Sequence, residues 1–86
     1  MDFGQALVAL KQGRKVQRSG WNGKGLFVFL VPASTFVVNR PPLLGIYPEG
    51  TVINYNAHMD IKNVNGSIST WVPSVNDCLA EDWVVV

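Results

Sequence analysis

The fold of this chain is decided by residues 52–71, which read VINYNAHMDIKNVNGSISTW. The first half of this stretch alternates apolar and polar side chains, a pattern that predicts a β-strand with two different faces. The apolar face carries Ile53, Tyr55, Ala57, Met59 and Ile61, and the polar face carries Asn54, Asn56, His58, Asp60 and Lys62. Asn65-Gly66 is the strongest two-residue signal for a hairpin turn, so we expect the chain to return antiparallel at this point.

The same turn predicts the position of Trp71. If Asn65 and Gly66 are the two turn residues, Asp60 faces Trp71 across the hairpin. Cross-strand partners share a face of the sheet, so Trp71 is expected on the polar face, beside Asp60 and near His58. A shift of the register by one residue would move Trp71 to the apolar face.

One helix is predicted, at the N-terminal end, over Asp2–Gln12. Asp2 and Gln5 match a capping box, and an apolar stripe follows at helical spacing. The residues of this stripe are Phe3, Ala6, Leu7 and Leu10. Ser74 or Asn76 is expected to cap a second, short helical turn that ends at Leu79.

The remaining segments favour short strands. They are Val16–Arg18, Leu26–Val31, Thr35–Val38 and Asp82–Val86. Leu26–Val31 is apolar at every position, which predicts a central strand that is buried on both faces. We therefore expect an α+β fold in a single domain over residues 1–86, with the N-terminal helix packed on a small antiparallel β-sheet.

Size and composition favour a homo-oligomer. The chain has 86 residues and a mass of 9.4 kDa, and only 15% of its residues are charged, against about 25% in soluble domains. A chain of this length buries only about 60% of its unfolded surface. No apolar run is long enough to span a membrane, no signal peptide is found, and the single cysteine is compatible with a reducing cytoplasm.

The charges are unevenly distributed along the chain. Six of the seven Lys and Arg residues precede Pro48, and five of the six acids follow it, while the formal net charge is only +1. The basic half could form a patch for phosphates. Because the total is close to zero, neutralisation between the two halves, in the fold or across subunits, is the favoured interpretation.

The sequence contains no convincing catalytic or metal-binding set. His58 and Cys78 are the only histidine and cysteine, and Cys78 is expected to be a small buried apolar residue. His58 and Asp60 are too few for a metal site and are expected to form a hydrogen-bonded pair. We therefore expect no catalytic residue, no metal ion and no cofactor.

Binding features are stronger. Trp21 and Asn22 lie in a glycine-rich loop, in which the amides near Asn22 and Gly23 could hold a phosphate while the indole stacks on a base. The alternative is an ordinary turn with Trp21 folded onto the core. Arg40 precedes two prolines and could hold a phosphate through two hydrogen bonds or form a structural ion pair. Trp83, in contrast, is expected in the core.

The predicted ligand site combines aromatic, basic and polar groups. Trp21 and Trp71 would stack on rings, while Asp60, Asn76 or Asp77 would accept hydrogen bonds from ribose hydroxyls or base amino groups. The complete set is Trp21, Asn22, Gly23, Arg40, Asp60, Trp71, Asn76 and Asp77.

Several uncommon motifs, taken together, resemble a known family. They are GWNGKG at 20–25, VNRPPLLGIYPEG at 38–50, HMDIK at 58–62, WVPS at 71–74 and DCLAEDW at 77–83. The chain resembles the second type of Thoeris anti-defence proteins, which are found in phages and prophages. Cys78, where an apolar residue such as leucine is expected, and Asn63-Val64 depart from the pattern.

The resemblance implies a homotetramer that sequesters cyclic nucleotide immune signals without cleaving them, in the cytoplasm of an infected bacterial host. The implied ligands are glycocyclic ADP-ribose isomers made by TIR-domain enzymes, and for some members cyclic dinucleotides of CBASS, made by bacterial cGAS-like enzymes. A non-catalytic phage structural or nucleic-acid-binding module is the alternative. The low net charge argues against a nucleic acid polymer as partner, and no membrane partner is expected.

Overall fold

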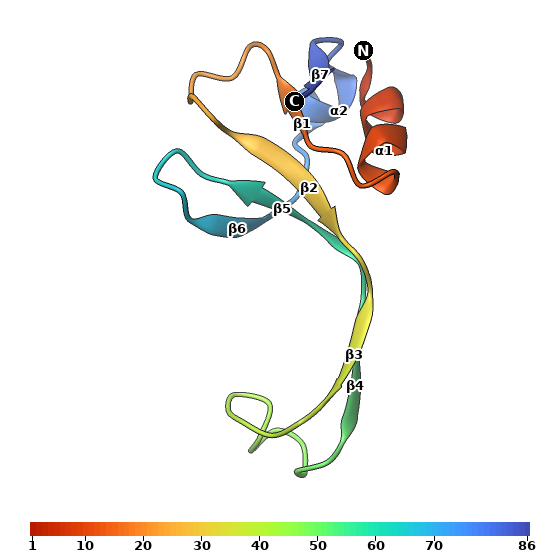
Figure 1. Cartoon of the computed structure of the whole chain (residues 1–86), viewed down its shortest axis with the longest axis vertical. Helices are drawn as coiled ribbons and strands as arrows, with labels where there is room; N and C mark the ends of the chain where they lie inside the picture. Colours follow the sequence, from red (N-terminus) through yellow and green to blue (C-terminus); the bar gives the residue numbers. More distant parts are fainter.

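Helix α1 (Phe3–Lys11) begins where the capping pattern predicted, in a computed structural model that describes residues 1–86 (Figure 1). The backbone N–H of Gln5 donates to Asp2 Oδ1 at 2.8 Å, and the N–H of Asp2 donates to Gln5 Oε1 at 3.0 Å. These two bonds complete the predicted capping box. The helix buries Ala6, Ala9 and Leu10 against the sheet.

The main sheet, which we call the head sheet, has five antiparallel strands in the order β6-β5-β2-β1-β7. Their bounds are β1 Val16–Arg18, β2 Phe27–Val31, β5 His58–Lys62, β6 Ile68–Trp71 and β7 Trp83–Val85. Val16, Val28 and Trp83 form one core with helix α1, and all three are fully buried. The predicted α+β class, the central place of β2 and the core position of Trp83 are confirmed.

Only one face of the head sheet is covered by the rest of the chain. Within β2 only Val28 is buried, and the other four residues are half-buried. Phe27 and Phe29 point to the face opposite α1, with ring centroids 6.0 Å apart. The expectation that this strand is buried on both faces is therefore wrong for a single chain, because Lys15 and Lys62, whose ammonium groups lie over the Phe27 ring, leave this second face half-buried.

A two-stranded arm projects from the head (Figure 1). It consists of β3 (Ser34–Val37) and β4 (Val52–Tyr55), which pair antiparallel. Val31 faces His58 in the head and Ser34 faces Tyr55 in the arm, so the register of the β2–β5 pair continues unbroken. The predicted continuous strand through residues 52–62 is nevertheless interrupted at residues 56–57, opposite Pro32, which has no N–H to donate to the ladder.

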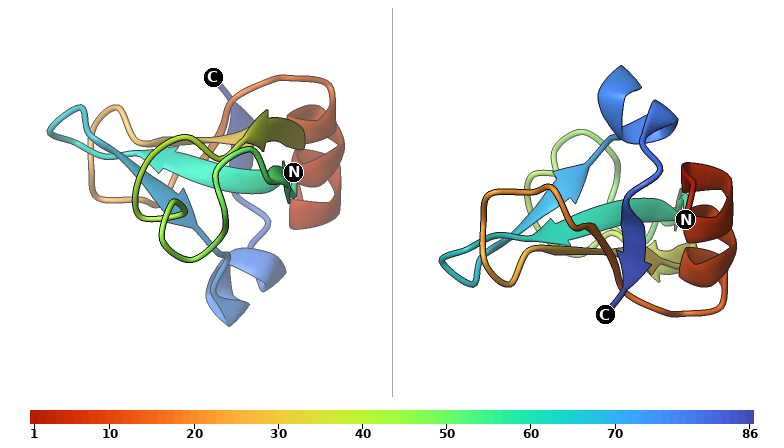
Figure 2. Two further views of the ribbon diagram at one scale, coloured as in Figure 1. Left: turned by 90° about the horizontal axis from the view of Figure 1, so that it is seen from below. Right: turned by 90° about the horizontal axis from the view of Figure 1, so that it is seen from above.

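The arm makes the molecule long. Its extents are 46 × 26 × 22 Å and its radius of gyration is 15.9 Å. A compact domain of this length has a radius of gyration of about 12 Å. Views along the long axis show α1 at one end of the head and α2 (Val75–Leu79) projecting from its side (Figure 2).

The β5–β6 hairpin differs from the prediction by one residue. The N–H of Asn63 donates to the carbonyl of Ser67 at 2.8 Å around a three-residue loop, and Gly66 adopts a φ of +88°. Trp71 consequently pairs with Met59 instead of Asp60. The expectation of Trp71 on the polar face is therefore wrong, because this register packs the indole against Trp83 at 6.0 Å.

Helix α2 is capped by Ser74, which settles the predicted choice between Ser74 and Asn76. The N–H of Asp77 donates to Ser74 Oγ at 3.1 Å, and the N–H of Ser74 donates back to Asp77 Oδ2 at 3.0 Å. None of the residues of α2 is buried. The expectation that Cys78 is buried is therefore wrong, since the helix stands away from the core and leaves the thiol exposed. Neither helix has the length and apolar character needed to cross a bilayer.

Candidate functional site

Three tryptophans gather beside the glycine-rich loop at residues 20–25. The rings of Trp21 and Trp71 meet edge to face with centroids 6.4 Å apart. Both also contact Trp83 edge-on, at 5.4 Å and 6.0 Å. Trp83 is completely buried, whereas Trp21 and Trp71 are half-buried. These two indoles therefore belong to the edge of the core and still reach the surface.

The glycine-rich loop is held in one shape by close contacts. The N–H of Gly20 donates to Asp82 Oδ2 at 3.0 Å, and a Cβ at this position would lie 2.8 Å from the same oxygen. A Cβ at Gly23 would lie 2.7 Å from Leu26 and 2.8 Å from Val64. A side chain at either point would require the neighbouring side chains of Asp82, or of Leu26 and Val64, to move.

Four backbone amides of this loop, those of residues 22–25, have no protein acceptor. The N–H of Trp21 donates to the carbonyl of Arg18 at 3.1 Å, but those of Asn22 and Gly23 take part in no hydrogen bond. Successive free amides in a turn attract anions. The loop therefore offers free N–H donors, those of Asn22 and Gly23 among them, next to a half-buried indole, and their binding of a phosphate stays a prediction.

Arg18 binds the loop, α2 and β7 together. Its Nη1 lies 3.0 Å from Asp77 Oδ1 and its Nε lies 2.9 Å from Asp82 Oδ1. The hydrogen bond from Arg18 lowers the pKa of Asp82, and the bonds from both carboxylates raise the pKa of Arg18. Burial raises the pKa of Asp77. Hydrogen bonds from Ser74 and from the Arg18 guanidinium lower it by more, so the pKa of Asp77 lies below its ordinary value.

Asp77 and Asn76, the two candidate ligand residues on α2, differ in whether their side chains are free to bind a ligand. Both carboxylate oxygens of Asp77 already accept hydrogen bonds within the chain, from Arg18 and from the N–H of Ser74. Its carbonyl also accepts from Nε1 of Trp83 at 2.9 Å. Asn76 is exposed, and its side chain forms no hydrogen bond.

Asp60 lies on the opposite face of the head sheet from Trp71. Its Oδ1 is buried without a hydrogen-bond partner and lies 3.5 Å from Nε2 of His58. This separation is too long for the predicted hydrogen bond, and the contact becomes an ion pair only when His58 is protonated. No group of three or more His, Cys, Asp or Glu side chains is close enough to hold a metal ion.

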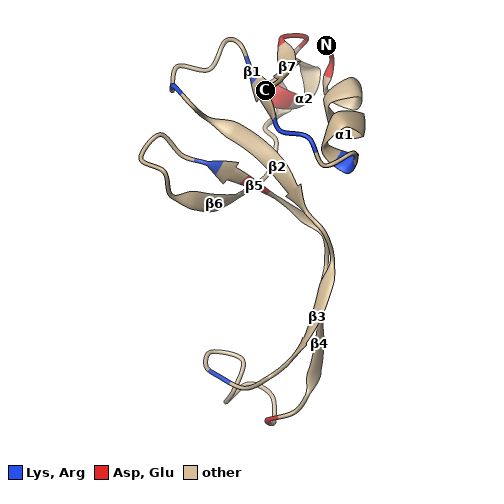
Figure 3. Cartoon of the chain, in the orientation of Figure 1, with Lys and Arg blue, Asp and Glu red and all other residues tan.

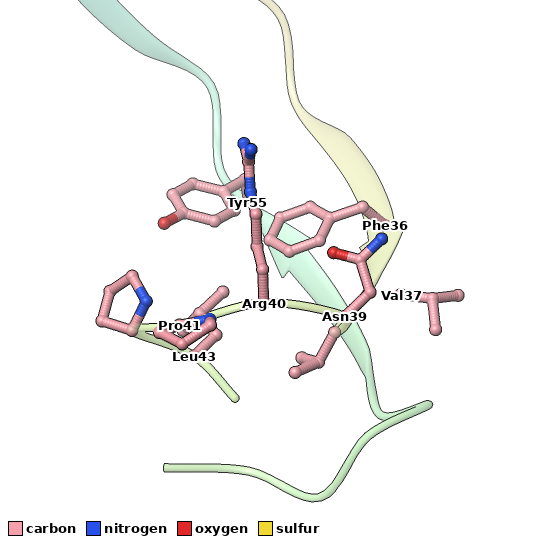
Figure 4. Close-up of a pocket in the computed structure, with 9 residues that line it drawn as sticks. Phe36, Val37, Asn39, Arg40, Pro41, Leu43 and Tyr55 are labelled. Atoms are coloured by element: carbon pink, nitrogen blue, oxygen red, sulfur yellow. The ribbon is translucent and has the colours of Figure 1, made fainter. Parts of the chain in front are cut away.

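The far end of the arm contains a cavity of about 550 Å³ (Figure 4). It is lined by Phe36, Val37, Val38, Asn39, Arg40, Pro41, Pro42, Leu43 and Tyr55. Arg40 was singled out from the sequence, but Phe36 and Tyr55 were not. Pairing the two predicted strands on either side of the diproline loop would have placed these two aromatic residues together.

Comparison with known proteins identifies the family. The profile of the Thoeris anti-defense 2-like domain matches residues 1–86. The chain belongs to this family. It is 43% identical to "Thoeris anti-defense 2" of Bacillus phage SP01 over 86 residues, which cover 100% of the chain and 94% of the relative. Membership of the Thoeris anti-defense 2-like family supports an anti-defence role for the chain.

In this member of the family, the predicted ligand residues fall into three places. Trp21, Asn22, Gly23, Trp71 and the α2 residues lie at the tryptophan end of the head. Asp60 lies on the other face of the head sheet, and Arg40 lies in the arm cavity. The eight residues do not form one pocket within a single chain.

Proposed function

We propose that this protein captures a cyclic nucleotide immune signal and withholds it from its receptor without cleaving it. The observation that carries the proposal is the half-buried Trp21–Trp71 pair beside the free amides of Asn22 and Gly23. Aromatic side chains stack on bases of any kind, and free turn amides bind phosphate oxygens. In an anti-defence family, this combination suits a small nucleotide.

The ligand class follows from the family resemblance. A glycocyclic ADP-ribose isomer made by a TIR-domain enzyme is the primary candidate, and a cyclic dinucleotide of CBASS is the second. Both carry a base for an indole and phosphates for the amides. The protein would act in the cytoplasm of the infected bacterial host, where these signals are made.

Capture without cleavage is supported by the placement of the one histidine. His58 lies on the face of the head sheet opposite Trp71, so its imidazole does not face the tryptophan pair. Asp77, on α2, has both oxygens engaged by Arg18 and Ser74. Neither group is placed as a base beside the proposed ligand.

A homotetramer is supported by the surface of the single chain. Only seven of its 86 residues are buried, and the arm exposes several large apolar side chains. These are Phe36, Val37, Ile46, Tyr47, Val52 and Tyr55. Contiguous exposed apolar surface is typical of protein interfaces, so we propose that copies of this chain cover one another.

The test is a thermal-shift screen of the full chain against a panel of cyclic nucleotides. A ligand present at 100 times its Kd stabilises the native state by about 2.7 kcal/mol, which raises the Tm of a domain of this size by about 10 °C or more. The complex is then denatured and the ligand recovered by chromatography. Recovery of the intact ligand supports capture, and a product formed in proportion to the protein contradicts it.

A further inference from the structure

We propose that Asp82 is a positioning residue for ligand capture. Its carboxylate accepts a hydrogen bond from the backbone of Gly20, and this bond sets the shape in which the glycine-rich loop presents its free amides. Asp82 acts through the loop and not by contact with the ligand. The proposal rests on the capture proposed above, because it states how the protein prepares that site before a nucleotide arrives.

Asp82 holds the first residues of the loop through both its backbone and its side chain. Its carbonyl accepts the N–H of Ser19 at 3.0 Å, and its Oδ2 accepts the N–H of Gly20 at 3.0 Å. The β1–β7 ladder ends at Arg18, so Asp82 continues the pairing for two residues beyond the strand. The chain then turns, with the N–H of Trp21 donating to the carbonyl of Arg18 at 3.1 Å. The path on which the loop leaves the sheet is therefore set by Asp82.

The carboxylate of Asp82 is itself held in one orientation. Its Oδ1 accepts from Nε of Arg18 at 2.9 Å, while Nη1 of the same guanidinium is bound to Asp77. The hydrogen bond from Arg18 lowers the pKa of Asp82, so this group is ionised at neutral pH. Trp83, the next residue along the chain, is completely buried. Because an ionised acceptor forms the stronger hydrogen bonds, the contact with Gly20 is a firm one.

The groups that would bind a nucleotide follow this contact directly in the sequence. Trp21 comes next after Gly20, and its ring lies against Trp83 with centroids 5.4 Å apart. The free amides of residues 22–25 come next. Without the bond to Asp82, the start of the loop is free to move, and the indole and the amides must be ordered when the nucleotide binds. That ordering costs free energy, so the loss of the bond should appear as a loss of affinity.

The bond can be broken from either end. A Cβ at residue 20 would lie 2.8 Å from Asp82 Oδ2, so Gly20→Ala should push the carboxylate away. Gly20 is not among the glycines with a positive φ, which means that alanine suits its backbone and disturbs only this contact. Asp82→Ala removes the acceptor itself, together with the partner of Arg18.

The first experiment measures hydrogen exchange of the backbone amides by NMR on the intact chain without ligand. Asp82→Ala and Gly20→Ala should each raise the exchange rate of the amide of residue 20 at least tenfold. The amide of Ser19 is the internal control. Its acceptor is the backbone carbonyl of residue 82, so its exchange rate should stay the same.

The second experiment measures the Kd of glycocyclic ADP-ribose for the same variants by titration calorimetry. Each substitution should weaken binding at least fivefold. The double variant should bind no more weakly than Asp82→Ala, because both substitutions remove the same hydrogen bond. If Asp82→Ala does not fold, Gly20→Ala alone carries the test of both exchange and affinity.

The matched control is Ala9→Gly, which weakens helix α1 at a buried position away from the loop. It should lower the Tm and leave the Kd unchanged at a temperature well below the transition. An equal loss of affinity in Ala9→Gly would show that lost stability, and not loop shape, weakens binding, and would overturn the proposal.

Three further results would overturn the positioning role. One is an unchanged exchange rate at residue 20 in both variants, and another is an unchanged Kd in both. The third is a double variant whose loss of affinity is the product of the two single losses. If the unchanged chain does not bind glycocyclic ADP-ribose, the proposed capture of this signal is contradicted. Faster exchange at residue 20 in both variants would still support Asp82 as the residue that shapes the loop.

Discussion

At the scale of single residues, Trp83 links the stability of the fold to the candidate site. Its buried ring contacts Phe3 and Trp21, each with centroids 5.4 Å away, and its Nε1 donates to the carbonyl of Asp77. Trp21 lies at the edge of this cluster and remains half-buried. We therefore expect replacement of Trp21 to weaken ligand binding and replacement of Trp83 to destabilise the fold.

We expect Trp21→Ala to weaken binding of the cyclic nucleotide by about 5- to 150-fold, because stacking contributes about 1–3 kcal/mol per base. Trp83→Ala should instead cost about 3–5 kcal/mol of stability, since it empties the core. The Tm without ligand and the Kd with ligand separate the two effects. If Trp21→Ala unfolds before binding can be measured, Trp21 is structural and the proposed site is wrong.

The Arg18 ion pairs make stability depend on pH on the acidic side. The pKa values of Asp77 and Asp82 lie below their ordinary value of 3.8 in the folded chain. The unfolded chain therefore binds protons first as the pH falls, and stability is lost progressively from about pH 5 downward. We expect a Tm that is level above about pH 5 and falls below it.

Asp82→Asn should flatten this acid dependence, because one of the two titrating partners of Arg18 is gone. Glu49→Gln is the matched control, since Glu49 is exposed and has no ion pair. Melting curves recorded over the acidic range provide the comparison. Equal acid dependence in Asp82→Asn and the unchanged chain would contradict the role assigned to the pair.

At the scale of elements, local signals in the sequence were enough to locate helices and turns. Asp2 with Gln5, and Ser74 with Asp77, close capping boxes within four residues of chain. The face of Trp71 could not be obtained in this way. Asn65-Gly66 fits a loop of two residues or of three, and the choice between them is made by packing on Trp83, which is distant in the sequence.

The three-residue loop gives a test of the hairpin. Gly66→Ala places a side chain at a φ of +88° and should cost about 1–2 kcal/mol of stability. Gly66→Asn should cost less, because asparagine tolerates this conformation better than other residues. Each kcal/mol corresponds to about 4–8 °C in Tm for a domain of this size. An unchanged Tm in Gly66→Ala would show that the loop adopts another shape in solution.

The candidate site could be predicted only in part, because some of its contacts join residues that are distant in the sequence. The glycine-rich setting of Trp21 and the prolines after Arg40 are visible within a few residues of sequence. The Phe36–Tyr55 pair depends on β3 and β4 meeting across a long loop. Asp60 and Trp71 lie on opposite faces because the β5–β6 pairing is shifted by one residue from the predicted pairing. Local patterns in the sequence did not decide between these two pairings.

At the scale of the whole molecule, the arm and the open face of the head sheet leave much apolar surface uncovered. Only two charged residues, Arg40 and Glu49, lie between Pro32 and Ala57 (Figure 3). A chain this short has few other ways to bury apolar area. Association of copies would remove both surfaces from water.

We expect light scattering at micromolar concentration to give a mass four times the 9.4 kDa of the chain. Val52→Lys, on an arm residue that is 63% exposed, should shift this mass toward smaller species, because a lysine is costly to bury without a partner. Val8→Lys, on α1 and 57% exposed, is the matched control and should keep the mass. A stable monomer of the unchanged chain would contradict the proposed tetramer.

The shared register of head and arm restricts how this protein can change in length during evolution. An insertion in β3 must be matched by one of equal size in β4, because Val31–His58 and Ser34–Tyr55 share one register across the break between the two sheets. An odd number of residues per strand would turn Phe36 and Tyr55 to the opposite side of the ribbon relative to the head. Tolerated insertions should therefore come as two residues in each strand, and each such step would move the Arg40 loop about 7 Å farther from the head.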